Sequence, residues 1–435
     1  MAEASASSPA SRLRREIGRF ALTALVVNAI LGSGIFGLPD DIVRAVGAAA
    51  PLAYLLAAAG IAVVMACFAE VASRFGEAGG PYLYARAAFG GFVGLQTGWF
   101  AWLVRITSAA ANANLFVVYL GQFWPAATDP LPRAAILVLL LGTLTVINVR
   151  GVRQGARLST WATVMKLVPL AVFLGGGILF AGGGAKLDLG GGEGRWAAAI
   201  LALMFAFGGF EAALIPMGEA KDPRRDVPVA LFGGLLVVAA IYLGVHLAVA
   251  AALPDSASYG TPAVQERPVA EAARVILGPA GAALIAAGVM LSTGGYLAGQ
   301  FVSAPRLTFA LAERGDFPRF LAAVHPRFAT PHASIVLHGV LVATFAIQGS
   351  FLWNAVLSAV ARLVTYGVVC GAVPRLRRRY QGPAGFRVAG GPILPILGLG
   401  FCVWLAAEMT AQHALIAGAI VLVATANWAW VRRRG

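Results

Sequence analysis

The sequence predicts an all-α polytopic membrane protein with twelve transmembrane helices. Hydrophobic residues make up 59% of the 435 residues and charged residues only 12%, whereas soluble domains carry about 25% charged residues. The mean hydropathy, +0.79, is correspondingly high. Apolar runs of about 20 residues are long enough to cross a bilayer as helices. Such runs lie at residues 20–45, 50–74, 91–123, 133–149, 158–182, 196–217, 228–253, 277–303, 332–349, 352–373, 393–409 and 413–431.

The distribution of positive charge predicts the orientation of the chain. The formal net charge of +14 would also suit a protein that binds nucleic acid. Most lysines and arginines, however, fall in the tails and in alternate loops, on the side of the membrane that holds both termini. This is the positive-inside pattern. We therefore expect an integral protein of the cytoplasmic membrane, with both termini in the cytoplasm, a lipid bilayer around it and no nucleic-acid partner.

Glycines interrupt two of the predicted spans. The first span contains Gly32-Ser33-Gly34, and the sixth contains Gly208-Gly209 followed by Glu211. Glycine holds a helix poorly, and backbone groups freed inside a membrane need polar partners. Glycine also serves close helix packing in membranes. Two clusters at positions five spans apart nevertheless favour an inverted repeat, whose broken helices hold a substrate near the midplane.

The paired breaks predict how the chain is organised, because the second five-span unit would insert with the opposite orientation to the first. The predicted parts are a cytoplasmic N-terminal tail (1–19), a first five-helix repeat (20–182), a second, inverted five-helix repeat (196–373), a cytoplasmic basic loop (374–392) and accessory helices 11 and 12 (393–431). None of the segments outside the spans is long enough to form a soluble domain.

The sequence lacks the residue groupings of an enzyme or a metalloprotein. Cys67, Cys370 and Cys402 all lie in apolar runs and predict no disulfide framework. None of the five histidines has metal-ligand spacing with another. No grouping of nucleophile and base falls at membrane depth. We therefore predict a protein that is not an enzyme and that needs no metal and no cofactor.

Four segments, taken together and in order, resemble the amino acid–polyamine–organocation (APC) superfamily of permeases. They are Gly32-Ser33-Gly34-Ile35-Phe36; Ala78-Gly79-Gly80-Pro81-Tyr82-Leu83-Tyr84; Gly208-Gly209-Phe210-Glu211 with residues 218–228; and Ala304-Pro305-Arg306 with residues 314–318 and 325–328. The resemblance extends from about residue 18 to residue 375. It implies a LeuT-type five-plus-five inverted repeat with two added helices. It also implies secondary transport of amino acids or related amines, without enzymatic chemistry.

The resemblance further implies how an amino acid would be held. Its carboxylate would meet the backbone N–H groups and the hydroxyl at Ser33, Gly34 and Ile35. Its ammonium group would meet free carbonyls at Ile30, Phe205, Ala206 and Gly208, and Phe205 matches an aromatic lid position. The charge of helix ends agrees with this arrangement, because an exposed helix N-terminus attracts anions and unwound carbonyls attract cations.

The residues that would read the substrate's side chain are predicted from helical spacing on the third span. Arg105, Ser108, Ala109 and Asn112 share one face there. Small residues leave room, and Phe207 adds apolar surface beside the second break, which favours a neutral amino acid. The positive charge of Arg105 argues against a cationic substrate and is compatible with an acidic amino acid. The alternative for Arg105 is a snorkelling residue or the structural partner of an acidic group.

Lys166 lies inside the fifth span and is the predicted coupling residue. Its surroundings resemble those of a subset of the superfamily in which a lysine takes the place of a sodium ion. By that resemblance its ammonium would lie near the carbonyls of Asn28 and Leu31 and the hydroxyl of Ser292. This implies sodium independence, with the lysine either carrying a proton or bracing an exchanger. The alternative is a lysine that snorkels to the interface.

Three further charged residues fall at or near the spans. Glu211 is a candidate proton acceptor or gate residue, or else a structural hydrogen-bonding group that stabilises the break. We expect Arg362, on the tenth span, to be a packing or lipid-headgroup residue. Glu70, at the end of the second span, is expected at the interface.

The functional prediction is a sodium-independent secondary active transporter of neutral amino acids, working by alternating access as a proton-coupled symporter. Alternatives in the same class are an obligatory amino acid exchanger and a transporter of polyamines or other amines. A polyamine would need more acidic residues near the pocket than Glu211 alone. A different class is a non-transporting amino acid sensor. Monomer and homodimer both remain open.

Overall fold

The computed structural model describes residues 18–75, 80–151, 155–181, 191–214, 223–380, 386–388 and 390–432. Within these ranges every regular element is a helix, so the all-α prediction is confirmed. The helices up to residue 181 are α1 (Arg19–Ile30), α2 (Gly34–Gly37), α3 (Pro39–Val46), α4 (Ala50–Ala72), α5 (Gly80–Phe89), α6 (Gly91–Leu120), α7 (Pro130–Arg150) and α8 (Gly155–Ala181). Those that follow are α9 (Trp196–Ala206), α10 (Phe210–Ala213), α11 (Pro223–Ala252), α12 (Pro262–Glu266), α13 (Pro268–Glu313), α14 (His332–Gln348), α15 (Phe351–Arg379), α16 (Ile393–Ala406) and α17 (Ala411–Arg432).

Most of these helices are suited to a membrane. Among the described residues, nine helical segments are long and apolar enough to cross a bilayer. Three shorter apolar helices accompany them, at Leu167–Phe180, His332–Gln348 and Ile393–Ala406. These findings support a polytopic membrane protein. The count of twelve spans and the inverted repeat stay predictions.

The first predicted break separates α1 from α2. Helix α1 ends at Ile30, and Leu31 leaves helical geometry with ψ near 87°. Helix α2 begins at Gly34 and lasts for a single turn. The chain therefore loses its helical hydrogen-bonding pattern across residues 31–33, where the first glycine cluster lies.

The second predicted break separates α9 from α10. Helix α9 ends at Ala206 and α10 begins at Phe210. Gly209 has φ of +106°, a left-handed conformation that a side chain would strain. A Cβ atom at Gly209 would also run into the carbonyl oxygen of Ala29. Glycine is thus required here by backbone conformation and by the close approach of α1.

The two breaks contact one another directly. A Cβ atom placed on Gly34 would lie 2.7 Å from the Cα of Ala206, so the start of α2 packs against the end of α9 with backbone contact. Tyr242 of α11 lies behind both breaks and packs its ring on Phe207, with 5.0 Å between ring centroids. Segments far apart in the sequence therefore form one centre.

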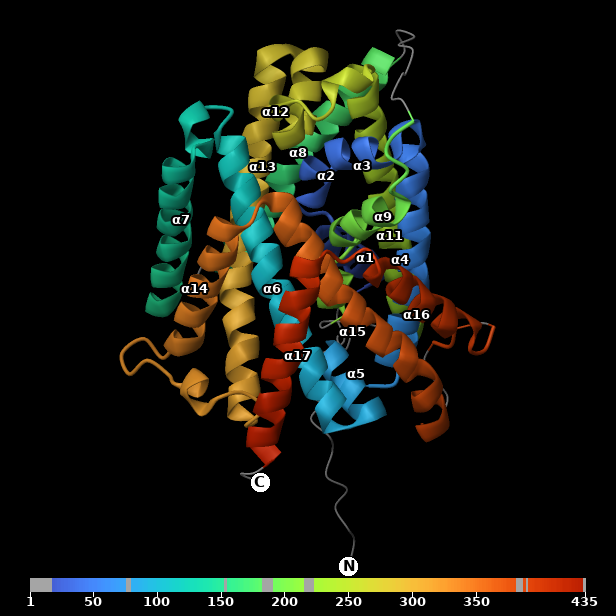
Figure 1. Ribbon diagram of the computed structural model, residues 1–435, viewed down its shortest axis with the longest axis vertical. Coiled ribbons are helices and arrows are strands. Elements are labelled where there is room, and N and C mark those ends of the chain that lie inside the picture. The colour runs from blue at the N-terminus through green and yellow to red at the C-terminus, as the bar shows by residue number, and fades with distance from the viewer. Residues whose placement is uncertain are drawn as a thin grey trace, which may run out of the picture.

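The apolar interior is divided between two sets of helices. One large buried cluster draws chiefly on α1, α3, α4, α9, α11, α15 and the first half of α13. A second draws chiefly on α6, α7, α13 and α14. The C-terminal end of α17 lies at the same end of the molecule as α5, whereas α3 and α12 lie at the opposite end (Figure 1). We call these the terminal end and the α12 end.

Candidate functional site

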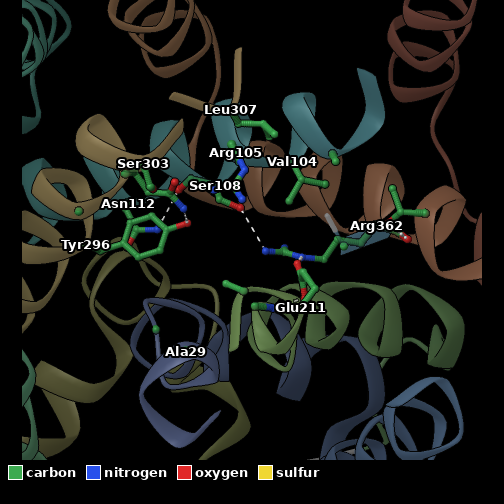
Figure 2. A pocket seen from close by; sticks show the side chains of 18 of the residues that line it. Ala29, Val104, Arg105, Ser108, Asn112, Glu211, Tyr296, Ser303, Leu307 and Arg362 are labelled. Carbon is green, nitrogen blue, oxygen red and sulfur yellow. Dashed lines mark hydrogen bonds and ion pairs between the residues drawn. The ribbon is translucent and has the colours of Figure 1, made fainter. Parts of the chain in front are cut away.

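A cavity of about 520 Å³ lies between the two sets of helices. Both breaks line it, the first through Leu31 and Gly32 and the second through Gly209. Charged and polar side chains from α6, α10, α13 and α15 face it (Figure 2). The polar and charged lining side chains are Asn28, Tyr82, Arg105, Ser108, Asn112, Glu211, Ser292, Tyr296, Gln300, Ser303, Arg362 and Thr365.

The cavity extends from the breaks towards the terminal end. Its lining includes Gly80, Pro81 and Tyr82 at the start of α5, together with Leu307 and Leu311 near the end of α13. These elements lie at the terminal end in Figure 1. At this mouth the Tyr82 hydroxyl donates to the Asp316 carboxylate at 2.5 Å. Burial and the nearby Asp316 carboxylate raise the pKa of the Tyr82 hydroxyl, which keeps it a donor at neutral pH.

The α12 side of the breaks is closed by packing. The Tyr119 hydroxyl of α6 donates to the carbonyl of Phe36 at 2.8 Å. Phe205 of α9 meets Phe351 of α15 edge to face, with ring centroids 5.9 Å apart. Neither Tyr119 nor this aromatic pair lines the cavity. The described structure is therefore open at one end of the breaks and sealed at the other.

Glu211 and Arg362 form the central ion pair, which faces the cavity. Arg362 Nε lies 3.1 Å from Glu211 Oε1, and the contact is visible in Figure 2. Glu211 Oε2 also accepts from the Gly209 amide and from the Tyr366 hydroxyl, each at 3.0 Å. The carboxylate thus stabilises the second break. Arg362 was predicted to be a packing or lipid-headgroup residue, and the lipid-headgroup alternative is wrong, because Arg362 is buried and pairs with the carboxylate of Glu211 on another helix.

Arg362 also connects the central ion pair to α6. Its guanidinium donates to Ser358 Oγ at 2.9 Å and to Ser108 Oγ at 3.4 Å. The two serine hydroxyls lie 2.8 Å apart. One charged network therefore joins α10, α15 and α6 beside the cavity. A Cβ atom at Gly208 would lie 2.6 Å from Arg362 Nε, so that position has no room for a side chain.

Tyr242 is a site residue that the sequence reasoning missed. Its fully buried hydroxyl lies 3.0 Å from the carbonyl of Ile30 and 2.9 Å from that of Ala206. Both carbonyls were predicted to hold an ammonium group. The signal was present in the sequence, because a tyrosine inside the apolar run 228–253 has a hydroxyl that must find a partner.

The residues predicted to hold the substrate carboxylate lie at the first break but do not line the cavity. Ser33, Gly34 and Ile35 are all buried. The Ser33 hydroxyl has no hydrogen-bond partner among the described residues. Phe205 is buried as well, with its ring 5.9 Å from the Arg362 guanidinium. Their role in binding stays a prediction.

Only some of the residues predicted to form the side-chain pocket line the cavity. Arg105 and Asn112 line the cavity, and Asn112 Nδ2 donates to the Ser108 carbonyl at 2.8 Å. Ala109 is buried in the apolar cluster that α6 shares with α7, α13 and α14. Phe207 is buried against Tyr242. The cavity as described reaches neither Ala109 nor Phe207.

The predicted coupling residues can be placed only in part. Lys166 belongs to α8, and its side chain lies outside the described part of the structure. Asn28, Leu31 and Ser292 all line the cavity, close to the first break and on α13. That the lysine meets them stays a prediction.

Glu70 of α4 is buried inside the protein, and its position at the depth of the membrane interface stays a prediction. Its carboxylate receives Arg377 Nε at 2.7 Å and Nη2 at 2.6 Å. Arg74 and the amide of Val388 donate to it at 3.1 and 2.9 Å. We call this group the inner clasp. A carboxylate with four donors needs no contact with water or lipid headgroups.

Comparison with known proteins decides the family. A family model described as amino acid permease matches residues 17–426. The chain belongs to the amino acid permease family. The resemblance to the APC superfamily is thereby confirmed.

Named relatives of this permease are transporters. It is 27% identical over 432 residues to the serine/threonine exchanger SteT of Bacillus subtilis, with 95% of each chain covered. It is also 27% identical to the methylthioribose transporter of the same organism, over 92% of this chain and 89% of that one. An uncharacterised transporter of Mycobacterium bovis is 30% identical, over 94% and 89%. The permease is an integral protein of the cell membrane that transports amino acids or related solutes, and it is not an enzyme.

Proposed function

We propose that the permease is a secondary active amino acid transporter that works by alternating access. The observation that carries this proposal is a cavity that reaches both broken helices from one end, while aromatic packing seals the other end. With both termini in the cytoplasm, as the charge distribution predicts, this conformation faces inwards. A transporter must pass through such a state to release its substrate.

The breaks offer complementary groups for an α-amino acid. Ser33 Oγ is buried without a described partner at the start of α2, where a carboxylate is attracted. The carbonyls of Ile30 and Ala206 share the one hydroxyl of Tyr242. A phenol has one proton to donate, whereas an ammonium group has three. We infer that the amino acid binds across both breaks when α2 and α9 separate, and that its ammonium group then displaces the Tyr242 hydroxyl.

The two apolar clusters support a two-body movement. We propose that α1, α2, α4, α9, α10 and α11 form a moving bundle, and that α6, α7, α13 and α14 form a scaffold. The apolar contacts of α1, α4, α9 and α11 belong to the first cluster and those of α6, α7 and α14 chiefly to the second, whereas α13 contributes to both. The cavity lies between the two groups. On this proposal the two bodies derive from the predicted inverted repeats, and α8 and α15 act as gates.

The cavity's charge argues against the polyamine alternative. Arg105 and Arg362 both line it, and Glu211 is already paired with Arg362. A polycation would enter a cavity with an excess of positive charge, which Coulomb repulsion disfavours. We therefore keep amino acids as the proposed substrate class.

For coupling, we propose sodium-independent transport in which Lys166 carries a proton, with obligatory exchange as the alternative. The relative SteT is named an exchanger. The test uses purified protein in proteoliposomes with an imposed pH gradient and radiolabelled amino acid outside. Wild type, Lys166→Ala and, as a matched control in the predicted outer loop, Lys186→Ala are compared with and without internal amino acid.

Each result of this experiment has a defined meaning. Proton symport is supported if the gradient drives net uptake in wild type and Lys186→Ala but not in Lys166→Ala. Uptake that requires internal amino acid and ignores the gradient overturns symport in favour of exchange. A sodium requirement overturns sodium independence. Specific binding of an amino acid without any flux would exclude transport and support a non-transporting amino acid sensor.

A further inference from the structure

Arg105 lies near the middle of α6 and lines the cavity. It forms no hydrogen bond and no ion pair with any residue that the structure describes. Its position excludes the snorkelling alternative, because a residue at mid-helix cannot bring its charge to the interface beside lipid headgroups. An arginine held at membrane depth without a partner is costly, and such residues mark substrate pathways.

The positive charge of Arg105 has no compensating carboxylate among the side chains that line the cavity. The charged lining residues are Arg105, Arg362 and Glu211. Glu211 faces Arg362 at 3.1 Å and also receives the Tyr366 hydroxyl and the Gly209 amide. The central ion pair is therefore neutral and its carboxylate already has its donors. Within the described part of the chain, one positive charge in the cavity has no anion opposite it.

Further donors are gathered on the side of the cavity where Arg105 lies. Tyr296 of α13 accepts from Gln300 Nε2 at 2.8 Å, so its own hydroxyl proton is available to a third group. Ser303, one turn beyond Gln300, also lines the cavity. In Figure 2, Tyr296 and Ser303 lie on one side of Arg105, and Arg362 and Glu211 lie on the other. A guanidinium with hydroxyl donors around it suits a carboxylate.

We propose that the substrate is an acidic amino acid, whose side-chain carboxylate binds Arg105. The inference rests on the proposed function, in which the breaks hold the α-carboxylate and the α-ammonium group. Arg105 is then free to bind a second anionic group. This substrate class replaces the neutral one predicted from the small residues of the pocket, because those residues indicate space, whereas Arg105 specifies charge.

The test compares L-glutamate with L-glutamine, which has nearly the same shape and no side-chain charge. Binding to the purified, full-length permease is followed by ligand-dependent thermal stabilisation at a series of concentrations. The variants are Arg105→Gln and, as a matched control, Arg274→Gln, which removes a half-exposed arginine paired with Glu271. We expect wild type and Arg274→Gln to prefer glutamate. Arg105→Gln should weaken glutamate binding by about 10–100-fold, the range for a charged hydrogen-bonded pair, and leave glutamine unchanged.

A second variant keeps the test informative if Arg105→Gln does not fold. Tyr296→Phe removes one proposed donor and no charge, and it should weaken glutamate binding severalfold without changing glutamine binding. Equal affinity of wild type for glutamate and glutamine, or stabilisation by neutral amino acids alone, overturns the acidic class and leaves the proposed function intact. Failure of wild type to bind any amino acid overturns both. An Arg105→Gln variant that changes only the dependence on chloride overturns the inference, because Arg105 would then bind a solution anion.

Discussion

The central ion pair and the inner clasp use the same chemistry in different surroundings. Each joins a glutamate to an arginine of α15, Glu211 to Arg362 and Glu70 to Arg377. In the clasp the arginine donates through two nitrogens, at 2.6 and 2.7 Å, to a carboxylate with no exposed surface. In the central pair one nitrogen donates, at 3.1 Å, to a carboxylate that is 20% exposed and faces the cavity.

This difference indicates which pair can rearrange. A bidentate pair whose carboxylate is closed to water is held by geometry as well as by charge, and it loses both if it opens. A single contact beside a water-accessible cavity can exchange its partner for water or for a bound solute. We therefore expect the inner clasp to hold α4 to α15 throughout the cycle, and the central pair to change with substrate.

Loss of the clasp carboxylate should have the largest effect on stability. Glu70→Gln leaves the largely buried side chains of Arg377 and Arg74 against a neutral group, so we expect the free energy of unfolding to fall by about 3–5 kcal/mol. Denaturant titration or thermal denaturation in detergent measures this loss. The control is Glu271→Gln, whose partner Arg274 is 49% exposed, and it should cost about 1 kcal/mol or less. If the two variants are equally stable, the clasp does not hold α4 to α15.

Loss of the central carboxylate should affect transport more than stability. In Glu211→Gln the amide can still accept from Gly209 and Tyr366, and water in the cavity can hydrate Arg362. We expect a loss of about 1–3 kcal/mol in the free energy of unfolding and roughly tenfold or greater loss of flux in proteoliposomes, which corresponds to about 1.4 kcal/mol. If Glu211→Gln transports normally and is as unstable as Glu70→Gln, the central ion pair is a fixed structural contact and does not rearrange with substrate.

Loss of the uncharged hydrogen bonds of Tyr242 should have the smallest effect on stability. Tyr242→Phe removes the one hydroxyl shared by the carbonyls of Ile30 and Ala206, so the free energy of unfolding should fall by about 1 kcal/mol. An amino acid that brings N–H donors to these carbonyls would then restore more stability than it does in wild type. Ligand-dependent thermal shifts in the two proteins measure this. Identical shifts would contradict displacement of the Tyr242 hydroxyl by substrate.

Local features of the sequence predicted a large part of the fold. The apolar runs located the long helices, and the glycine clusters located both breaks, between Ile30 and Gly34 and between Ala206 and Phe210. These predictions succeed because hydropathy and backbone freedom belong to short stretches of chain. Family motifs carried the resemblance that the comparisons confirm. Span count, repeat symmetry and substrate contacts stay predictions.

The site was predicted less completely, because its contacts join distant helices. Helical spacing placed Arg105 and Ala109 on one face, yet only Arg105 lines the cavity, since α7, α13 and α14 cover the other side of α6. Spacing also says nothing of the rotation of α15. That rotation turns Arg362 towards Glu211 and away from lipid.

By itself, the sequence determined that this chain crosses a membrane, where two of its helices break, and which charged residues lie within it. These properties follow from the transfer energy of side chains and from the weakness of glycine in a helix. Only the tertiary structure decided which charges neutralise one another. Glu211 with Arg362, Glu70 with Arg377, and Arg105 without a described partner are outcomes of helix packing. A Coulomb interaction depends on the distance between side chains in space, which the order of residues does not set.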